Sequence, residues 1–191
     1  FAVDFLKANT KSFLDSKLED NNYISSKDKN VIVIGGGDTG TDCVGTALRH
    51  GCKSLVQFEI MGEPVKERAE NNPWPEWPKV LKVDYGQEEF IALYGKDPRE
   101  YLTTVTALHA DKDGNLESVD TVKVEWKKDE SGRFSPVPVE GSEKNWPAEL
   151  VLLAMGFTGS QNYIKEAFGV ESDPRTNIKA SDVDFKTNVH K

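Results

Sequence analysis

Cysteine is scarce in this sequence: Cys43 and Cys52 are the only two among 191 residues, and their spacing matches neither a CxxC pair nor a metal site. We therefore expect two reduced thiols, a cytoplasmic setting, and no metal ion or iron–sulfur cluster held by this chain. A run of 18 or more apolar residues is also lacking, so the sequence predicts no transmembrane helix. Residues 1–6 lack the basic start of a signal peptide, and because the first residue is Phe1, we expect a longer parent chain.

Basic residues are outnumbered as well, with 24 Lys and Arg against 32 Asp and Glu, which gives a formal net charge of -8. Nucleic acids and anionic membranes bind to basic faces, so we predict neither as a partner. Any bound phosphate must then be held by local donors. Apolar residues make up 37% of the chain, enough for one packed domain, or one domain with part of another.

Residues 31–60 have the pattern of a β-α-β unit. Val31–Ile34 is a short β-branched apolar run, typical of a parallel strand buried on both faces. The sequence then predicts a helix over Thr39–His50, ended by Gly51, and a second strand over Lys53–Ile60. The fold class predicted is therefore α/β, with a Rossmann-like nucleotide-binding domain.

The other predicted elements are less regular. A three-stranded antiparallel meander is indicated by alternating segments separated by turns at 111–115 and 129–132. Residues 160–191 have weak periodicity and no core, so we expect them to pack on another domain. The N-terminal part is predicted to form an imperfect helix over 4–18 and a linker that reaches residue 28. A proline-rich ordered loop over 61–85 and a short helix over Gln87–Tyr94 are expected next. The predicted strands are the meander strands Tyr101–Ala110, Ser118–Lys127 and Phe134–Val139, and a further strand over Glu149–Ala154.

A G-x-G-x-x-G motif joins the first strand to the first helix of the β-α-β unit. Gly35 would allow the tight turn, Gly37 would let the backbone approach a pyrophosphate, and Gly40 would let helix and strand pack closely. Free N–H groups at the helix start would receive the phosphates. The alternative is a tight turn without a ligand. The residues predicted to contact NAD(H) or NADP(H) here are Gly35, Gly36, Gly37, Asp38, Thr39 and Gly40.

Acidic side chains inside this motif need their own explanation, because a carboxylate beside a pyrophosphate is repulsive. We expect Asp38 to cap the helix and point away from the ligand, and Thr39 with Asp42 matches a T-x-x-D capping box. Glu59, 19 residues after Gly40, is placed to accept hydrogen bonds from the adenosine ribose hydroxyls. Its charge would repel a 2′-phosphate, which favours NAD. Lys66 and Arg68 are the opposing candidates for clamping a 2′-phosphate, so the choice of nucleotide stays open.

Two tryptophans, Trp74 and Trp77, stand among prolines in the loop. The alternatives are stacking on a nicotinamide, an interface with a partner domain, or anchoring of the loop to the core, and the last is favoured. His50 is predicted to be a helix-end charge and His109 a strand residue. The sequence contains no nucleophilic triad or carboxylate pair, so we predict no catalytic residue and no metal ligand. This is expected where cofactors carry the chemistry.

Several segments closely resemble the small (beta) subunit of glutamate synthase. They are the run from Val31 to Cys43, Gln57–Ile60, the tryptophan–proline block from Glu67 to Pro78, Val83–Gly86 and Leu152–Gly159. The resemblance spans nearly the whole chain, and the tryptophan–proline block makes it specific.

The resemblance implies hydride transfer from NAD(P)H to FAD and electron transfer through iron–sulfur clusters to a large subunit, which makes glutamate from glutamine and 2-oxoglutarate. It also implies a pyridine-nucleotide domain inserted in an FAD domain, as in disulfide-oxidoreductase-like flavoproteins. Residues 29–157 would be that inserted domain, residues 1–28 a helix and linker from the FAD domain, and residues 158–191 the return segment. Gly156, in the Met155–Gly159 return, is counted with the cofactor-binding residues.

This sequence departs from that family in lacking an FAD-type glycine motif, the cluster-ligating cysteines and the closing segment. We therefore expect a central fragment that binds NAD(P)H but is inactive alone, with FAD and clusters only in the intact subunit. The expected partners are the FAD domain and the large subunit, with a homodimer of the fragment as a further possibility. The alternative is a non-catalytic nucleotide-binding or interaction module with a Rossmann fold.

Overall fold

The computed structural model describes residues 1–130 and 132–189. It divides into two units, Phe1–Met155 and Gly156–Lys191, which are described separately. Ser131 of the predicted 129–132 turn lies outside the described residues, as do the last two positions of the predicted return segment.

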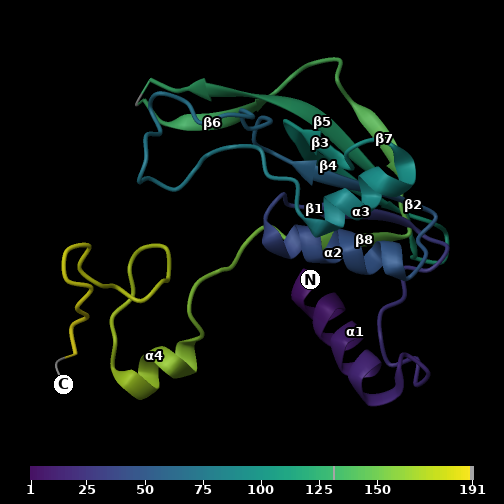
Figure 1. The fold of residues 1–191 in the computed structure, drawn as a ribbon, viewed down its shortest axis with the longest axis horizontal. Coiled ribbons are helices and arrows are strands. Elements are labelled where there is room, and N and C mark those ends of the chain that lie inside the picture. The colour runs from purple at the N-terminus through teal and green to yellow at the C-terminus, as the bar shows by residue number, and fades with distance from the viewer. Residues whose placement is uncertain (131, 190–191) are drawn as a thin grey trace. The chain divides into compact units, whose positions relative to one another are not determined.

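A four-stranded parallel sheet forms the centre of the first unit (Figure 1). Its strand order is β3-β2-β1-β8, and β1 pairs in parallel with both β2 and β8. The predicted β-α-β unit is confirmed, with α2 (Asp38–Arg49) as its crossover. The strands are β1 (Asn30–Ile34), β2 (Ser54–Glu59), β3 (Arg99–Tyr101) and β8 (Leu150–Leu153). The sequence did not predict β3, because three residues of mixed polarity carry no period-2 pattern.

An antiparallel sheet forms a second layer and contains the predicted meander. β4 (Thr103–Ala110) and β6 (Phe134–Pro138) both pair with the long strand β5 (Leu116–Lys128). A further strand, β7 (Lys144–Pro147), pairs with β5 along Ser118–Thr121 and was not predicted. Its four residues include Pro147 and two polar side chains, a composition with low strand propensity, so only the pairing with β5 defines it.

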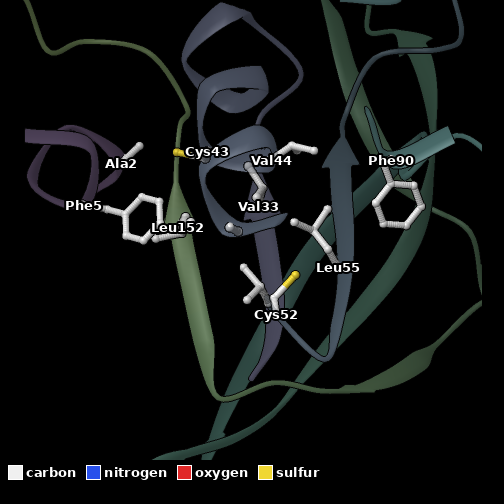
Figure 2. Packing of buried hydrophobic residues seen from close by; sticks show 11 residues of the cluster. Ala2, Phe5, Val33, Cys43, Val44, Cys52, Leu55, Phe90 and Leu152 are labelled. Carbon is white, nitrogen blue, oxygen red and sulfur yellow. The ribbon is translucent and has the colours of Figure 1, made fainter. Parts of the chain in front are cut away.

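The two faces of the parallel sheet bury different side chains. Val31 and Val33 of β1 face the helices and pack with residues of α2, whereas Ile32 faces the antiparallel sheet with Phe58. Figure 2 shows the helix side of this core, where Cys43 and Val44 lie over the sheet. Because β1 is buried on both faces, its continuous apolar run follows from its position, as predicted.

Helix α1 (Ala2–Ser16) packs on the edge of this core through Ala2 and Phe5, which are almost completely buried (Figure 2). It covers most of the helix predicted over 4–18 and ends where Lys17 adopts a left-handed conformation. Full burial of a side chain such as Phe5 contributes about 1.5–3 kcal/mol. Ala2 and Phe5 therefore belong to the core of the first unit.

Helix α3 (Tyr85–Tyr94) begins two residues before the predicted start and ends at Gly95, as predicted. Asp84 and Gln87 form a capping box at its N-terminus, which fixes that earlier start. The helix crosses α2 at two glycines, because a β-carbon on Gly45 would come 2.7 Å from the Tyr85 ring and one on Gly86 would overlap the Thr41 carbonyl. This close crossing holds the start of α3 against the first turns of α2.

The second unit contains α4 (Asn162–Phe168) and an isolated antiparallel bridge between Ser172 and Ile178. The sequence did not predict α4, a helix of seven residues with none of them buried. None of the described residues from 156 to 189 is buried, as expected for a segment without its own core. Across both units, the described helices are too short or too polar to cross a membrane.

Candidate functional site at the glycine turn

The chain turns from β1 into α2 over three glycines, and packing determines two positions of the motif. Gly35 has a φ of +122°, and its β-carbon would overlap the carbonyl of Ala154, the residue directly after β8. A β-carbon on Gly40 would overlap the Gly35 carbonyl and come 2.7 Å from the side-chain nitrogen of Gln57. The predicted roles of Gly35 in the tight turn and of Gly40 in close packing are therefore confirmed.

Gly37 differs from these two glycines because the fold itself does not require it. It is the N-cap of α2, with a φ of -82° that other residues adopt easily, and it is exposed. No atom lies within 4 Å of the place where its β-carbon would be. The absent side chain leaves open space in front of the helix N-terminus.

This helix start also presents unpaired backbone donors. The first bond of α2 runs from the Thr41 N–H to the Gly37 carbonyl at 3.1 Å. Among the residues that the structure describes, none accepts a hydrogen bond from the N–H groups of residues 36–40. Free N–H groups and the positive end of the helix dipole together favour an anion at this position.

The predicted capping roles of the acidic residues are wrong. Because Gly37 is the N-cap, Asp38 is the first residue of the helix and Thr39 lies within the first turn, and no side chain caps this end. Asp38 is exposed. Asp42 instead accepts a hydrogen bond of 2.5 Å from the Tyr85 hydroxyl, which ties α2 to α3.

Glu59 ends β2 at the same sheet edge as the glycine turn. Its carboxylate lies against Gly36, whose missing β-carbon leaves room for it, and its Oε1 accepts a hydrogen bond of 2.9 Å from the Met61 N–H. The paired residue on β3 is Tyr101. The Tyr101 hydroxyl is buried, finds no hydrogen-bond partner within residues 1–130 and 132–189, and has a pKa raised mainly by burial. The contact of the Glu59 carboxylate with Gly36 thus brings this side chain next to the glycine turn, as predicted.

The proline-rich loop is organised by polar contacts rather than by its tryptophans. The buried Asn72 side chain donates to the Trp77 carbonyl at 3.0 Å and accepts from the Lys79 N–H at 2.8 Å. Arg68 donates from Nη1 to the carbonyls of Asn72 and Glu76, at 3.0 and 2.9 Å. Arg68 is therefore a structural donor within its own loop.

The favoured prediction that Trp74 and Trp77 anchor the loop to the core is wrong. Their relative exposures are 82% and 75%, and the nearest specific contact is a Lys82 ammonium 4.2 Å from the centre of the Trp77 ring. Asn72 and Arg68 already hold the loop together, so the indole rings are left on the surface. They remain available for contact with another molecule or domain.

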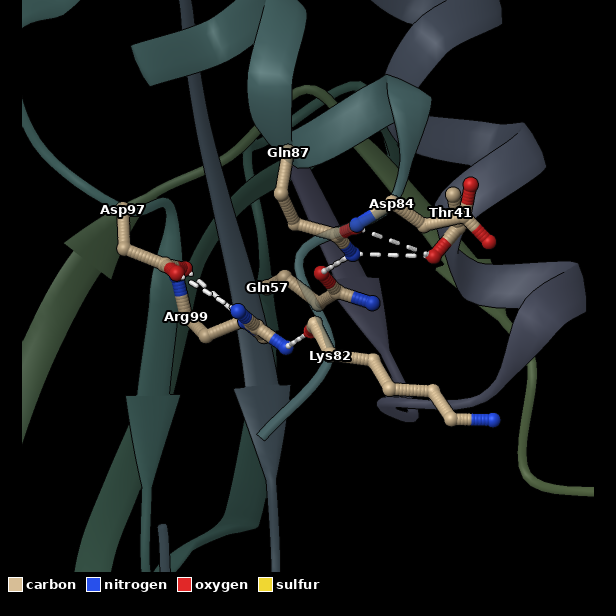
Figure 3. Close-up of polar contacts among 7 residues, drawn as sticks. All are labelled: Thr41, Gln57, Lys82, Asp84, Gln87, Asp97 and Arg99. Atoms are coloured by element: carbon tan, nitrogen blue, oxygen red, sulfur yellow. Dashed lines mark hydrogen bonds and ion pairs between the residues drawn. The ribbon is translucent and has the colours of Figure 1, made fainter. Parts of the chain in front are cut away.

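Sequence reasoning missed a buried polar network behind the glycine turn (Figure 3). Gln57 of β2 is fully buried and donates to the Gly35 carbonyl at 2.8 Å, and Gln87 of α3 donates to Gln57 at 3.0 Å. A glutamine between the apolar residues Val56 and Phe58 of an inner strand is the sequence feature that marks this network. Beside it, Arg99 pairs with Asp97 at 2.6 Å and donates to the Lys82 carbonyl at 2.9 Å, which fixes the end of the loop.

The cysteines and histidines do not add a reactive group to this site. Cys43 and Cys52 are free and buried, and burial raises the pKa of the Cys43 thiol to about 12. His50 lies at the end of α2 as predicted, but burial beside Phe5 and Tyr23 lowers its pKa, which disfavours the predicted charge. No group of three or more potential metal-binding side chains occurs in the described parts of the chain.

Comparison with known sequences places these features in context. A family model described as "Pyridine nucleotide-disulphide oxidoreductase" matches residues 6–191. Over 189 residues, 99% of the chain, it is 48% identical to a glutamate synthase (NADH) of Schizosaccharomyces pombe and 44% identical to a glutamate synthase (NADPH) small chain of Bacillus subtilis. It spans only 9% and 38% of those two relatives.

Solved structures share the fold at low sequence identity. Thioredoxin reductase of T. acidophilum matches with a TM-score of 0.52 and 20% identity, covering 85% of this chain and 42% of that one. FprA of Mycobacterium tuberculosis in complex with NADPH matches with a TM-score of 0.51 and 17% identity, covering 85% and 45%. The predicted flavoprotein-type α/β fold is thereby confirmed.

Proposed function

The chain belongs to the pyridine nucleotide-disulphide oxidoreductase family, and from this premise we propose that its glycine turn binds the pyrophosphate of NAD(P)H. The observation that carries the proposal is the open space at Gly37 in front of unpaired N–H groups. Packing accounts for Gly35 and Gly40, whereas only the approach of a ligand accounts for a glycine at position 37. A pyrophosphate there would accept hydrogen bonds from the helix start.

The residues present fit the rest of a dinucleotide. The Glu59 carboxylate stands beyond the turn, one strand further along the sheet, where it would accept hydrogen bonds from ribose hydroxyls. Gly36 would lie between the phosphates and the ribose of the dinucleotide. Asp38 and Thr39, in the first turn of α2, would contact the dinucleotide at the edge of the same site. The proposal that Gly156 also contacts the cofactor rests on the resemblance to the glutamate synthase small subunit alone. When bound, the nicotinamide supplies a hydride.

In the whole protein, this chain would serve as the NAD(P)H-binding part of a glutamate synthase. Relatives named glutamate synthase are 44–48% identical over 99% of the chain, which supports this role. The hydride acceptor would be FAD. Iron–sulfur clusters would carry the electrons onward to the large subunit, which forms glutamate and would be the partner. Residues 1–28 and 158–191 would connect to the FAD domain. We also propose that this chain forms a homodimer and that the whole protein is cytoplasmic.

Nucleotide preference is the finer part of the proposal. The two relatives named above are described with different nucleotides, NADH and NADPH, at similar identity to this chain. Both Nη1 contacts of Arg68 go to its own loop, so Glu59 is the stronger determinant of the two. We therefore favour NADH for this chain.

Calorimetric titration of the 191-residue chain with NADH and with NADPH tests the proposal. Saturable binding that Gly37→Val abolishes supports the glycine-turn site, and tighter binding of NADH supports Glu59 as the selector. The wild-type chain binding neither nucleotide, or Gly37→Val binding as tightly as wild type, would contradict the assignment. The control is Lys112→Val, which places the same side chain at an exposed position of the β4–β5 turn, far along the sequence from the motif.

A further inference from the structure

We propose that Gln57 and Gln87 are positioning residues that aim the glycine turn at the nucleotide, an inference that rests on the nucleotide-binding function above. Three hydrogen bonds connect the start of α3 to the turn, and Figure 3 shows the side chains of Gln57 and Gln87 that form them. The Asp84 N–H donates to Gln87 Oε1 at 3.2 Å, Gln87 Nε2 donates to Gln57 Oε1 at 3.0 Å, and Gln57 Nε2 donates to the Gly35 carbonyl at 2.8 Å. The chain of bonds runs in one direction from a backbone donor to a backbone acceptor.

The chemistry of the two ends fixes the orientation of both amides. The Gly35 carbonyl can only accept, so Gln57 must present its nitrogen there and its oxygen to Gln87. Gln87 must then present its nitrogen to Gln57, which leaves its oxygen for the Asp84 N–H. Thr41 completes the set, since its hydroxyl accepts from Gln87 Nε2 at 2.9 Å. Reversal of either amide would place like groups together inside the protein.

Burial gives this arrangement its strength. Gln57 is 0% and Gln87 2% exposed, so water cannot replace a bond that is lost. A buried amide without a partner costs more free energy than a typical net hydrogen bond contributes, and linked buried bonds are stronger than isolated ones. The two side chains are thus held rigidly behind the turn.

The consequence for the nucleotide follows from peptide geometry. In a planar trans peptide, the Gly35 carbonyl and the Gly36 N–H point in opposite directions. By holding that carbonyl, Gln57 directs the Gly36 N–H away from the buried Gln57 amide. Three consecutive glycines have more conformational freedom than other residues, because they lack β-carbons. The bond from Gln57 reduces this freedom at the Gly35–Gly36 peptide before the nucleotide binds, which lowers the entropic cost of binding.

The test compares nucleotide affinity with turn conformation and with stability. Gln57→Met keeps the length of the side chain and removes the donor. We expect it to weaken NADH binding about tenfold, the loss of roughly one well-aligned hydrogen bond, and to shift the amide NMR signals of Gly36 and Gly37 in the free chain. Thr41→Val should shift the same signals less, and Thr41→Ser, which keeps the hydroxyl, should restore them.

Val119→Ala is the matched control, because it opens a cavity in the core on the other face of the sheet. It should lower the melting temperature without moving the glycine signals or the affinity. The inference is overturned if Gln57→Met changes only stability, as Val119→Ala does. If Gln57→Met fails to fold, the comparison of Thr41→Val with Thr41→Ser takes its place. Glycine amide signals that shift in Thr41→Val and return in Thr41→Ser support the inference, and signals unchanged in both variants overturn it. If the wild-type chain binds no nucleotide, the proposed function fails, while the amide signals of the free chain still decide whether the glutamines set the turn.

Discussion

The carboxylate of Glu59 lies so close to the backbone of Gly36 that a β-carbon on this glycine would overlap one of its oxygens. The other oxygen is held by the Met61 N–H at 2.9 Å. A negative charge is therefore fixed beside the turn that offers free N–H groups. This pairing of donors and a carboxylate at one sheet edge would accept a pyrophosphate and a ribose while opposing a second phosphate on that ribose.

The first prediction concerns nucleotide choice. Glu59→Gln keeps the shape of the side chain and removes its charge, so we expect the affinity for NADPH relative to NADH to rise about tenfold. The ratio of the two dissociation constants, measured by calorimetry, provides the check. Glu63→Gln is the matched control, since it removes a charge four residues later on the exposed loop. Equal shifts in both variants would assign the effect to the overall charge of the chain instead of Glu59.

The second prediction separates two kinds of glycine within one motif. Gly37→Val should change the free energy of unfolding by less than about 1 kcal/mol, because its side chain enters open space, yet it should abolish nucleotide binding. Gly40→Ala should instead destabilise the fold by about 1–3 kcal/mol, since its β-carbon meets backbone atoms. Urea unfolding and calorimetry on both variants distinguish them. A strongly destabilised Gly37→Val would mean that packing, not a ligand, requires that glycine.

The third prediction concerns the loop. Trp74→Ala and Trp77→Ala should each change the stability of the free chain by no more than about 0.5 kcal/mol, because the indole rings are exposed. Asn72→Ala removes the buried amide that binds the loop carbonyl and N–H groups, so it should cost about 1–3 kcal/mol or release the loop locally. Thermal melts and limited proteolysis of the three variants provide the measurement. Equal losses for Trp77→Ala and Asn72→Ala would contradict this account.

The comparison of sequence and structure shows why some features were predictable. Val31–Ile34, the glycine motif and Gly51 are local signals, and they were sufficient for β1, α2 and the turn between them. Gly51 closes α2 through its N–H bond of 2.8 Å to the Leu48 carbonyl, as a glycine after a helix end commonly does. Such elements depend mainly on neighbouring residues, so a single sequence contains the necessary information.

The features that were missed depend on long-range contacts. Gln57 is surrounded by partners 22 and 30 residues away, and β7 exists only through its pairing with β5. The exposed position of Trp77 was also unpredictable, because it depends on the buried amide of Asn72 carrying the loop contacts. The buried network behind the turn therefore could not be derived from periodicity or spacing alone.

The last prediction concerns pH. The His50 ring accepts from the Ser26 N–H at Nδ1, 3.4 Å away, and its Nε2 lies 2.7 Å from Asn9 Oδ1, which defines a neutral ring that joins α1, the linker and α2. Burial lowers its pKa below the ordinary value of 6.5. Because the unfolded chain then binds a proton more readily than the folded one, stability is fully present above about pH 6.5 and decreases as the pH falls toward the folded-state pKa.

Urea unfolding at pH 7.5 and pH 5.5 should accordingly give a lower free energy of unfolding at the acidic pH. His50→Gln should reduce this difference, since the amide can still donate to Asn9 but does not titrate. His109→Gln is the matched control, because His109 lies on the β4–β5 pair beside Asp120, away from this junction. If His50→Gln keeps the full pH dependence, protonation of His50 is not what weakens the packing of α1 against α2.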